Sequence, residues 1–123
     1  KGKSEFDKNE NYDLEKIFYT FNYQYNKFRD LVSNREKILF YGATNGLNNL
    51  FYLIGEDIDC EKYRITDSDE RKWHKYISSH PLPILPTNHL EDYKTVCISA
   101  PSFYDQIAKS LPKDKIVIST VSI

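Results

Sequence analysis

The sequence lacks methionine altogether and holds only 2 cysteines in 123 residues. So few cysteines exclude a disulfide framework and suit a reducing cytoplasm. No apolar run approaches the length of about 18 residues that a membrane-spanning helix needs, and no signal peptide opens the chain. Acidic and basic residues nearly balance, and the net charge of −1 provides no general attraction to nucleic acid or to an anionic membrane. These absences predict a cytoplasmic protein with no membrane or nucleic-acid partner.

Apolar residues make up 40% of the chain and aromatic residues 15%, which is enough for one hydrophobic core. We expect a flexible lead-in over residues 1–12 and a single domain over residues 13–123. Within that domain, a helix over residues 13–34 precedes an α/β sheet over residues 37–123. The missing methionine and the end of the chain inside an apolar run indicate a fragment of a longer protein.

Apolar residues between Leu14 and Val32 recur with the three- and four-residue spacing of one helical face. The pattern predicts a long amphipathic helix that is rich in aromatic residues, with Asp13 as its cap. Two interpretations stay open for this helix. It either packs on its own domain or on a missing one, or it binds a partner, for instance by forming a homodimer through residues 13–33.

Short apolar runs alternate with helical patterns through the rest of the chain. Such alternation favours a Rossmann-like, three-layer α/β domain with a mainly parallel sheet of about five short strands. The expected strands cover residues 37–41, 63–66, 81–86, 94–100 and 115–121. The prolines make residues 81–86 either an edge strand or a strand-like connection. Helices are expected over residues 47–54 and 102–111, the second with a capping box that starts at Ser102.

The turn Gly42-Ala43-Thr44-Asn45-Gly46 joins the first expected strand to its helix. A glycine-rich turn at this place can direct backbone N–H groups and the start of the helix toward an anion. The dinucleotide fingerprint and the G-x-G-x-G of methyl-donor sites both require a glycine where this chain has Thr44. The turn is therefore either a tight connection without a ligand or the floor of a nucleotide site beside it. The candidate ligand-binding residues in it are Gly42, Thr44, Asn45 and Gly46.

Polar residues follow the second and fourth expected strands. Asp67 lies about 20 residues beyond the turn, where α/β nucleotide folds hold a carboxylate that binds ribose hydroxyls. The alternative is that Asp67 and Asp69 shape a solvated loop, because aspartate is common in turns. Ser99 and Ser102 are secondary candidates, since open parallel sheets bind ligands at the carboxyl ends of their strands.

The remaining constellations argue against a metal site and against catalysis in this fragment. His74, His80 and His89 are scattered through a proline-containing stretch, and no C-x-x-C motif is present. Cys97 lies inside an apolar strand, where we expect it to be buried and inert. The basic and aromatic residues 71–75 either meet a phosphate or a stacked base, or form a solvated loop around one packed tryptophan. A free-standing nicotinamide-dependent enzyme is disfavoured, because no Tyr/Lys or His/Asp catalytic pair is evident.

Several short motifs resemble the C-terminal domain of sugar C-methyltransferases. That domain opens with an apolar strand that runs into Tyr-Gly-Ala, as residues 37–43 do, and continues to an aspartate turn with a following lysine. Residues 67–72, Asp-Ser-Asp-Glu-Arg-Lys, are similar to this turn, and Leu-Pro-Ile at residues 82–84 resembles the family's Ile-Pro-Ile segment. Residues 94–111 resemble its later strand and helix, so that the resemblance spans residues 13–123.

The resemblance implies a domain that helps to hold a sugar nucleotide in an enzyme of bacterial polysaccharide or deoxysugar biosynthesis. Asp67 or Asp69 would accept hydrogen bonds from sugar or ribose hydroxyls, and Lys72 would neutralise a phosphate. In that family, S-adenosylmethionine and the catalytic residues belong to a preceding domain, so the fragment is expected to hold no cofactor and to have an upstream domain of the same chain as its partner. The alternative is a structural or oligomerisation domain with a vestigial pocket and no ligand.

Overall fold

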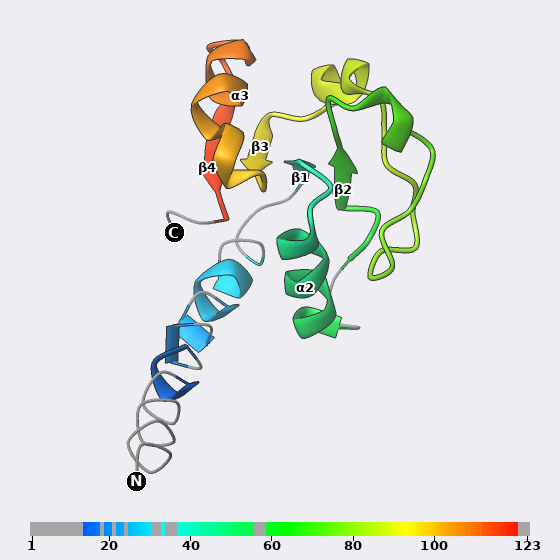
Figure 1. The fold of residues 1–123 in the computed structure, drawn as a ribbon. Helices are drawn as coiled ribbons and strands as arrows, with labels where there is room; N and C mark the ends of the chain where they lie inside the picture. Colours follow the sequence, from blue (N-terminus) through cyan, green and yellow to red (C-terminus); the bar gives the residue numbers. More distant parts are fainter. Residues whose placement is uncertain are drawn as a thin grey trace, which may run out of the picture.

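A computed structural model describes residues 14–17, 19–20, 22–23, 25–30, 33, 37–55 and 59–120 (Figure 1). Four parallel strands form one sheet in the order β2-β1-β3-β4. The strands are β1 (Ile38–Tyr41), β2 (Tyr63–Thr66), β3 (Thr95–Ile98) and β4 (Ile116–Ser119). The chain adds β2 on one side of β1 and then β3 on the other, so the order reverses between β1 and β3. This arrangement is consistent with the expected Rossmann-like fold.

The two central strands are buried along their whole length. In the register of the sheet, Phe40 of β1 lies between Ile65 of β2 and Cys97 of β3. A strand with neighbours on both sides and helices on both faces has no solvent-exposed position, which explains the continuous apolar runs in the sequence. Cys97 is fully buried, as its place in such a run predicts.

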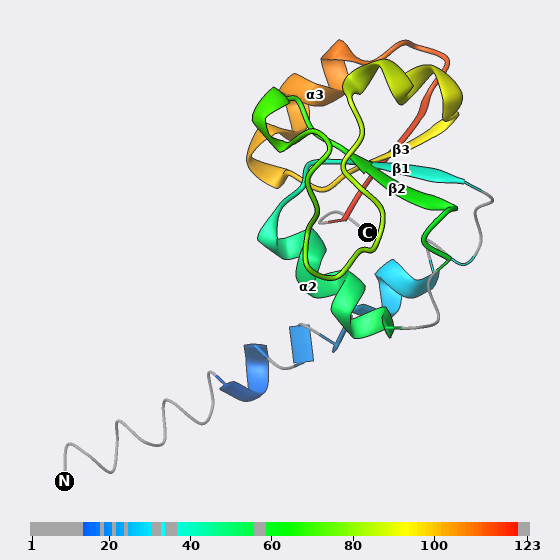
Figure 2. The same ribbon diagram turned by 90° about the vertical axis from the view of Figure 1, so that its right-hand side faces the viewer.

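Helices cover both faces of the sheet, as Figure 2 shows. On one face, α2 (Asn45–Ile54) buries Leu47, Phe51 and Ile54 in the core that contains Phe40. On the other face, α3 (Tyr104–Ser110) packs Ile107 against the core that contains Tyr41. The layers are therefore helix, sheet and helix, which confirms the α/β prediction.

Residues 81–86 are a connection with a single bridge, and the sheet accordingly has four strands rather than about five. The prolines at positions 81, 83 and 86 lack the N–H that a ladder requires. The segment nevertheless covers the outer edge of β2. Leu85 N–H donates to Ile65 O at 2.7 Å, Thr66 Oγ1 donates to Leu85 O at 2.8 Å, and His80 Nε2 lies 2.5 Å from Tyr63 O.

Three 3-10 turns complete the described chain: η2 (Glu70–Lys72), η3 (Thr87–Asp92) and η4 (Pro101–Phe103). The last of these corrects the prediction of a capping box at Ser102. Phe103 N–H donates to Ala100 O at 3.0 Å, so residues 101–103 turn more tightly than an α-helix, and α3 begins at Tyr104 without a side-chain cap.

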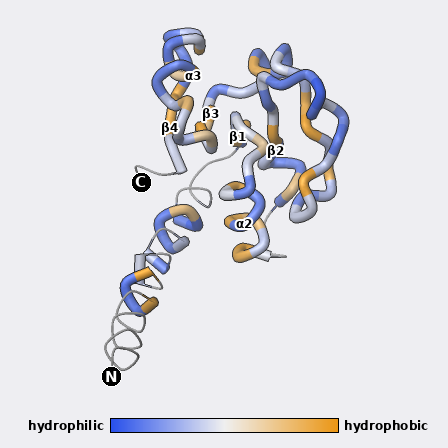
Figure 3. Tube along the Cα trace, viewed as in Figure 1, coloured by the Kyte–Doolittle hydropathy of each residue, from blue (hydrophilic) through white to orange (hydrophobic). Residues whose placement is uncertain are grey.

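The expected lead-in over residues 1–12, the cap Asp13 and part of the expected helix lie outside the described residues. The described positions between residues 14 and 33 are helical, and Figure 3 shows hydrophobic positions among hydrophilic ones along this segment. Phe28 is fully buried, and its ring centroid lies 5.7 Å from that of Phe40 and 6.2 Å from that of Phe51. This part of the segment packs on its own domain. In the ranges that the structure describes, no helix is long and apolar enough to cross a membrane.

Candidate functional site

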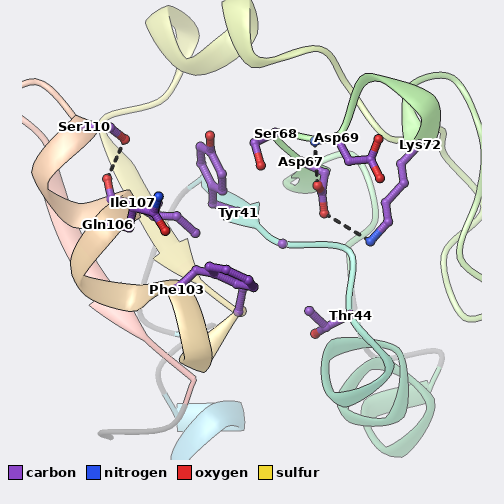
Figure 4. A pocket seen from close by; sticks show the side chains of 12 residues that line it. Tyr41, Thr44, Asp67, Ser68, Asp69, Lys72, Phe103, Gln106, Ile107 and Ser110 are labelled. Carbon is purple, nitrogen blue, oxygen red and sulfur yellow. Dashed lines mark hydrogen bonds and ion pairs between the residues drawn. The ribbon is translucent and has the colours of Figure 1, made fainter.

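A pocket of about 540 Å³ opens at the carboxyl ends of β1, β2 and β3 (Figure 4). It lies at the reversal of strand order between β1 and β3, which is where open α/β sheets bind ligands. Its lining residues are Tyr41, Gly42, Thr44, Asp67, Ser68, Asp69, Lys72, Ala100, Phe103, Gln106, Ile107 and Ser110. The predicted residues Gly42, Thr44, Asp67, Asp69 and Lys72 thus come together in one pocket.

Gly42 forms the floor of the pocket at the end of β1. Its φ is +123°, and a Cβ built on it would lie 2.9 Å from Cβ of Ala100. Its carbonyl oxygen accepts a hydrogen bond from Ser99 Oγ at 2.6 Å. The absent side chain therefore allows the ends of β1 and β3 to approach each other beneath the pocket.

Thr44, which interrupts the glycine fingerprint, has a structural role. Its Oγ1 accepts a hydrogen bond from Leu47 N–H at 3.2 Å and donates to Ser99 O at 2.8 Å. It is the N-cap of α2, and it holds the start of that helix to the end of β3.

Asp67 joins the β1–α2 turn to the loop after β2. It is 8% exposed, and its two carboxylate oxygens accept hydrogen bonds from the N–H groups of Ala43 and Asp69, each at 2.8 Å. Lys72 Nζ lies 3.6 Å from Asp67 Oδ2 and 3.4 Å from Ala43 O. The predicted ligand carboxylate and the predicted phosphate-binding lysine are thus in contact with each other in the wall of the pocket.

Asp69 caps η2 and pairs with Arg71. One of its oxygens accepts from the Arg71 N–H at 3.0 Å and from Nε at 2.9 Å, while the other accepts from Nη2 at 3.0 Å. The side-chain hydrogen bonds from Arg71 lower the pKa of Asp69 to about 2, with a further contribution from the Arg71 backbone N–H. Asp69 therefore carries a full negative charge at the rim of the pocket at neutral pH.

Tyr41 brings a phenol to the centre of the pocket, between the two walls in Figure 4. Burial raises the pKa of Tyr41 above its usual value, and the nearby negative charge of Asp67 adds to the rise. The hydroxyl therefore stays protonated at neutral pH and is able to donate a hydrogen bond.

Sequence reasoning missed the second wall of the pocket, which consists of Phe103 from η4 and Gln106, Ile107 and Ser110 from α3. Figure 4 shows this wall opposite Asp67, Asp69 and Lys72. Phe103 falls in the helix expected over residues 102–111 but was not among the candidate site residues, and its side chain is 58% exposed. The spacing of three, four and seven residues between these positions is that of one helical face, and its mixture of apolar and polar types is the signal that distinguishes it from a core face.

Several predicted site residues do not line the pocket. Asn45 and Gly46 are exposed at the start of α2, Ser99 is 2% exposed beneath the floor, and Ser102 points to solvent from η4. Asn45 and Gly46 lie outside the pocket because the turn directs Thr44 rather than these neighbours toward the end of β3, and Ser99 is held beneath the floor by its hydrogen bond to Gly42 O. Ser102 is displaced by the tight 3-10 turn that begins at Pro101.

The basic and aromatic cluster of residues 71–75 is mostly a solvated loop around Trp73. The indole Nε1–H donates to Asp67 O at 2.7 Å, and the ring packs against the core. Of this cluster, Lys72 lines the pocket. Within the described chain, no group of three or more His, Cys, Asp or Glu side chains is arranged to hold a metal ion.

The lining residues suit binding: they supply carboxylate and hydroxyl acceptors, one ammonium group, a phenol and an aromatic ring. Comparison of the chain with protein-family models, curated proteins and solved structures finds no match.

Proposed function

We propose that the chain is a sugar-nucleotide-binding α/β domain of a methyltransferase-like enzyme, and that it binds without catalysing. The observation that carries this proposal is the pocket at the reversal of strand order, with Lys72 and two carboxylates on one wall and the exposed ring of Phe103 on the other. A sugar nucleotide has phosphates, hydroxyls and an aromatic base, and the pocket has a complementary group for each.

Lys72 is suited to bind phosphate. Its side chain is 44% exposed and its ammonium group is held at the pocket wall by Asp67 and by the carbonyl of Ala43. An ionised carboxylate has about four acceptor positions, and Asp67 uses two for backbone N–H groups. The remaining positions are available for Lys72 and for a hydroxyl of the ligand.

The place of this domain in a larger enzyme follows from the family resemblance. The Tyr-Gly-Ala turn and the aspartate turn that carry that resemblance both contribute lining residues to the pocket. We assign S-adenosylmethionine, and the methyl transfer itself, to a domain upstream of this one, and the reaction to the biosynthesis of a bacterial polysaccharide or deoxysugar.

The test is a thermal-shift screen followed by titration calorimetry on the chain of residues 1–123. The panel contains dTDP-, UDP-, GDP- and CDP-sugars, together with NAD(P) and S-adenosylmethionine. Ligand at 100 times its Kd stabilises the folded state by about 2.7 kcal/mol, so binding of one nucleotide-sugar class is expected to raise the Tm clearly.

Lys72→Met is expected to weaken that binding about tenfold, because a charge-assisted contact to phosphate is lost. Lys75→Met is the matched control, since Lys75 is exposed in the same loop and does not line the pocket. A panel in which no nucleotide sugar binds, or in which S-adenosylmethionine or NAD(P) alone binds, contradicts the proposal.

Self-association through residues 13–33 is a second candidate function. The observation that favours it is the exposure of apolar side chains in this segment: Leu14 is 62% exposed, Ile17 63% and Tyr19 74%. Sedimentation velocity is expected to show a dimer that Ile17→Asp dissociates and that Tyr76→Asp, at an exposed site elsewhere, leaves unchanged. A strict monomer at high concentration contradicts this candidate.

A further inference from the structure

We propose that the wall formed by Phe103, Gln106, Ile107 and Ser110, here called the base wall, binds the nucleobase of the ligand and determines which nucleotide the pocket accepts. This inference rests on the proposed function, which treats the pocket as a nucleotide-sugar site without assigning its parts. It orients the ligand, with the heterocycle toward α3 and the phosphates toward Lys72.

The distribution of charge in the pocket favours this orientation. The charged lining residues Asp67, Asp69 and Lys72 all come from the loop after β2, whereas none of the base-wall residues is charged. Figure 4 shows the two groups on opposite sides of Tyr41. A nucleotide is divided in the same way, because its charge lies on the phosphates and its base is uncharged at neutral pH.

The exposed ring of Phe103 supplies the stacking surface. It is 58% exposed although it belongs to the wall of a pocket, so a large apolar area remains available there to a flat ligand. Ile107 lies one helical turn further on and extends the apolar surface. Aromatic side chains stack on every base, because each base presents a π-face.

Gln106 and Ser110 flank this apolar strip with hydrogen-bonding groups. The amide of Gln106 offers both a donor and an acceptor, which is the combination that the edges of bases present. Ser110 Oγ donates to Ile107 O at 2.6 Å, which leaves its oxygen oriented as an acceptor. Stacking therefore provides affinity for any base, and these two side chains provide the discrimination among bases.

The experiment compares the affinity of nucleoside diphosphates with that of phosphate compounds that contain no base. Titration calorimetry on the chain of residues 1–123 measures the Kd of UDP, dTDP, CDP, GDP and ADP, and of ribose 5-phosphate and pyrophosphate as base-free probes. We expect at least one nucleoside diphosphate to bind tenfold or more tightly than either base-free probe. We also expect Gln106→Ala to reduce the differences in Kd among the five nucleoside diphosphates.

The decisive variant is Phe103→Ala, which is expected to raise the Kd of the preferred nucleoside diphosphate about tenfold while leaving the Kd of pyrophosphate unchanged. Phe103→Tyr keeps the aromatic face and is expected to retain the affinity. Tyr76→Ala removes an aromatic side chain that is 62% exposed but lies outside the pocket, and it is expected to change neither value. The emission of Trp73, the only tryptophan, reports occupancy independently through its hydrogen bond to Asp67 O.

The outcomes separate this inference from the proposed function. Equal affinity for nucleotides and base-free probes, or an unchanged nucleotide Kd in Phe103→Ala, contradicts nucleobase binding by the base wall. Either result leaves the proposal of a phosphate-binding pocket in place. Failure of every nucleotide, sugar nucleotide and base-free probe to bind overturns both proposals.

Discussion

Gly42 shows how a single residue sets the geometry of the pocket floor. Its φ of +123° lies in a region that residues with a side chain rarely adopt. The approach of Ala100 adds a steric limit to this conformational one. Of the glycines predicted to shape the turn, Gly42 has both constraints and Gly46 has neither.

Gly42→Ala is therefore expected to lower the free energy of unfolding by about 1–3 kcal/mol or more, from backbone strain with an added clash. Gly46→Ala is the matched control. A Cβ at Gly46 would come no closer than 3.9 Å to Thr44 Oγ1, and alanine in a helix gains about 0.5–1 kcal/mol over glycine. Urea denaturation measures both values, and equal effects of the two substitutions would contradict the role assigned to the floor.

His80 is a buried histidine that the sequence placed in a polar stretch. It is 3% exposed, its Nε2–H donates to Tyr63 O at 2.5 Å, and its Nδ1 accepts from Leu82 N–H at 3.1 Å. These two bonds use the neutral ring, with its hydrogen on Nε2. Burial lowers the pKa of His80 below its usual value against the opposing effect of the bond to Tyr63, and the charge of Arg64 lowers it further.

The stability of the fold is expected to fall as the pH decreases below about 6.5, the ordinary pKa of histidine in the unfolded chain. Below that pH the unfolded state binds a proton that the folded state resists, so the full contribution is present only above it. Urea denaturation between about pH 7.5 and 5.5 measures the slope. His80→Gln should flatten this slope, and His89→Gln should preserve it, because His89 is 42% exposed. A slope that survives in His80→Gln would assign the effect to another group.

At the scale of elements, Asp67 links two segments of the chain through hydrogen bonds. Its carboxylate holds the β1–α2 turn through Ala43 N–H and the loop before η2 through Asp69 N–H. Its place at the end of β2 could be predicted, because the apolar strand ends at an acidic turn. Its backbone partners could not, since both depend on how β1 and β2 are brought side by side.

Asp67→Asn is expected to lower the free energy of unfolding by about 1.5–3 kcal/mol. Asparagine has a single acceptor oxygen, so its NH₂ group would face one of the two backbone N–H donors. Asp92→Asn, at an exposed carboxylate, is the control and should change stability by less than about 0.5 kcal/mol. Thermal and urea denaturation measure the stability of both variants, and an Asp67→Asn variant with unchanged free energy of unfolding would contradict this linking role. Any loss of ligand binding in this variant would report on the turn as well as on contact with the ligand.

The element that sequence reasoning located but misread is α3. The periodicity of Phe103, Ile107 and Leu111 predicts a helix there, and the structure contains one. The apolar periodicity alone does not distinguish a side chain that faces the core from one that faces a pocket; the polar residues Gln106 and Ser110 at the same helical spacing are what mark the pocket side. Leu111 is 7% exposed in the core, whereas Phe103, two turns earlier, forms a wall of the pocket.

At the scale of the whole molecule, the parallel sheet could be predicted because its central strands are short buried runs separated by helical patterns. The strand order could not, because the alternation of strands and helices is compatible with either side of β1 for each new strand. The pocket depends on that order, since it is the reversal between β1 and β3 that separates the ends of α2 and α3.

Hydrogen exchange should follow this architecture. Amides in β1 and β3 are expected to exchange most slowly, because both strands are paired on two sides and fully buried. Described amides between residues 14 and 23 should exchange fastest, because their side chains are exposed. Exchange measured by NMR or mass spectrometry tests the ranking. Slow exchange of residues 14–23 that disappears on dilution would instead indicate a covering second copy.

The cover over β2 has a consequence for how copies of this protein can associate. Residues 80–85 occupy the outer edge of β2, while in the described part of the chain no strand pairs with the outer edge of β4. In a fibril built by strand pairing, each molecule must pair with a neighbour at both edges of its sheet. With the outer edge of β2 covered, strand pairing between copies of this chain is confined to the β4 side of the sheet. A fibril, in which each molecule pairs at both edges of its sheet, is therefore blocked at the β2 edge.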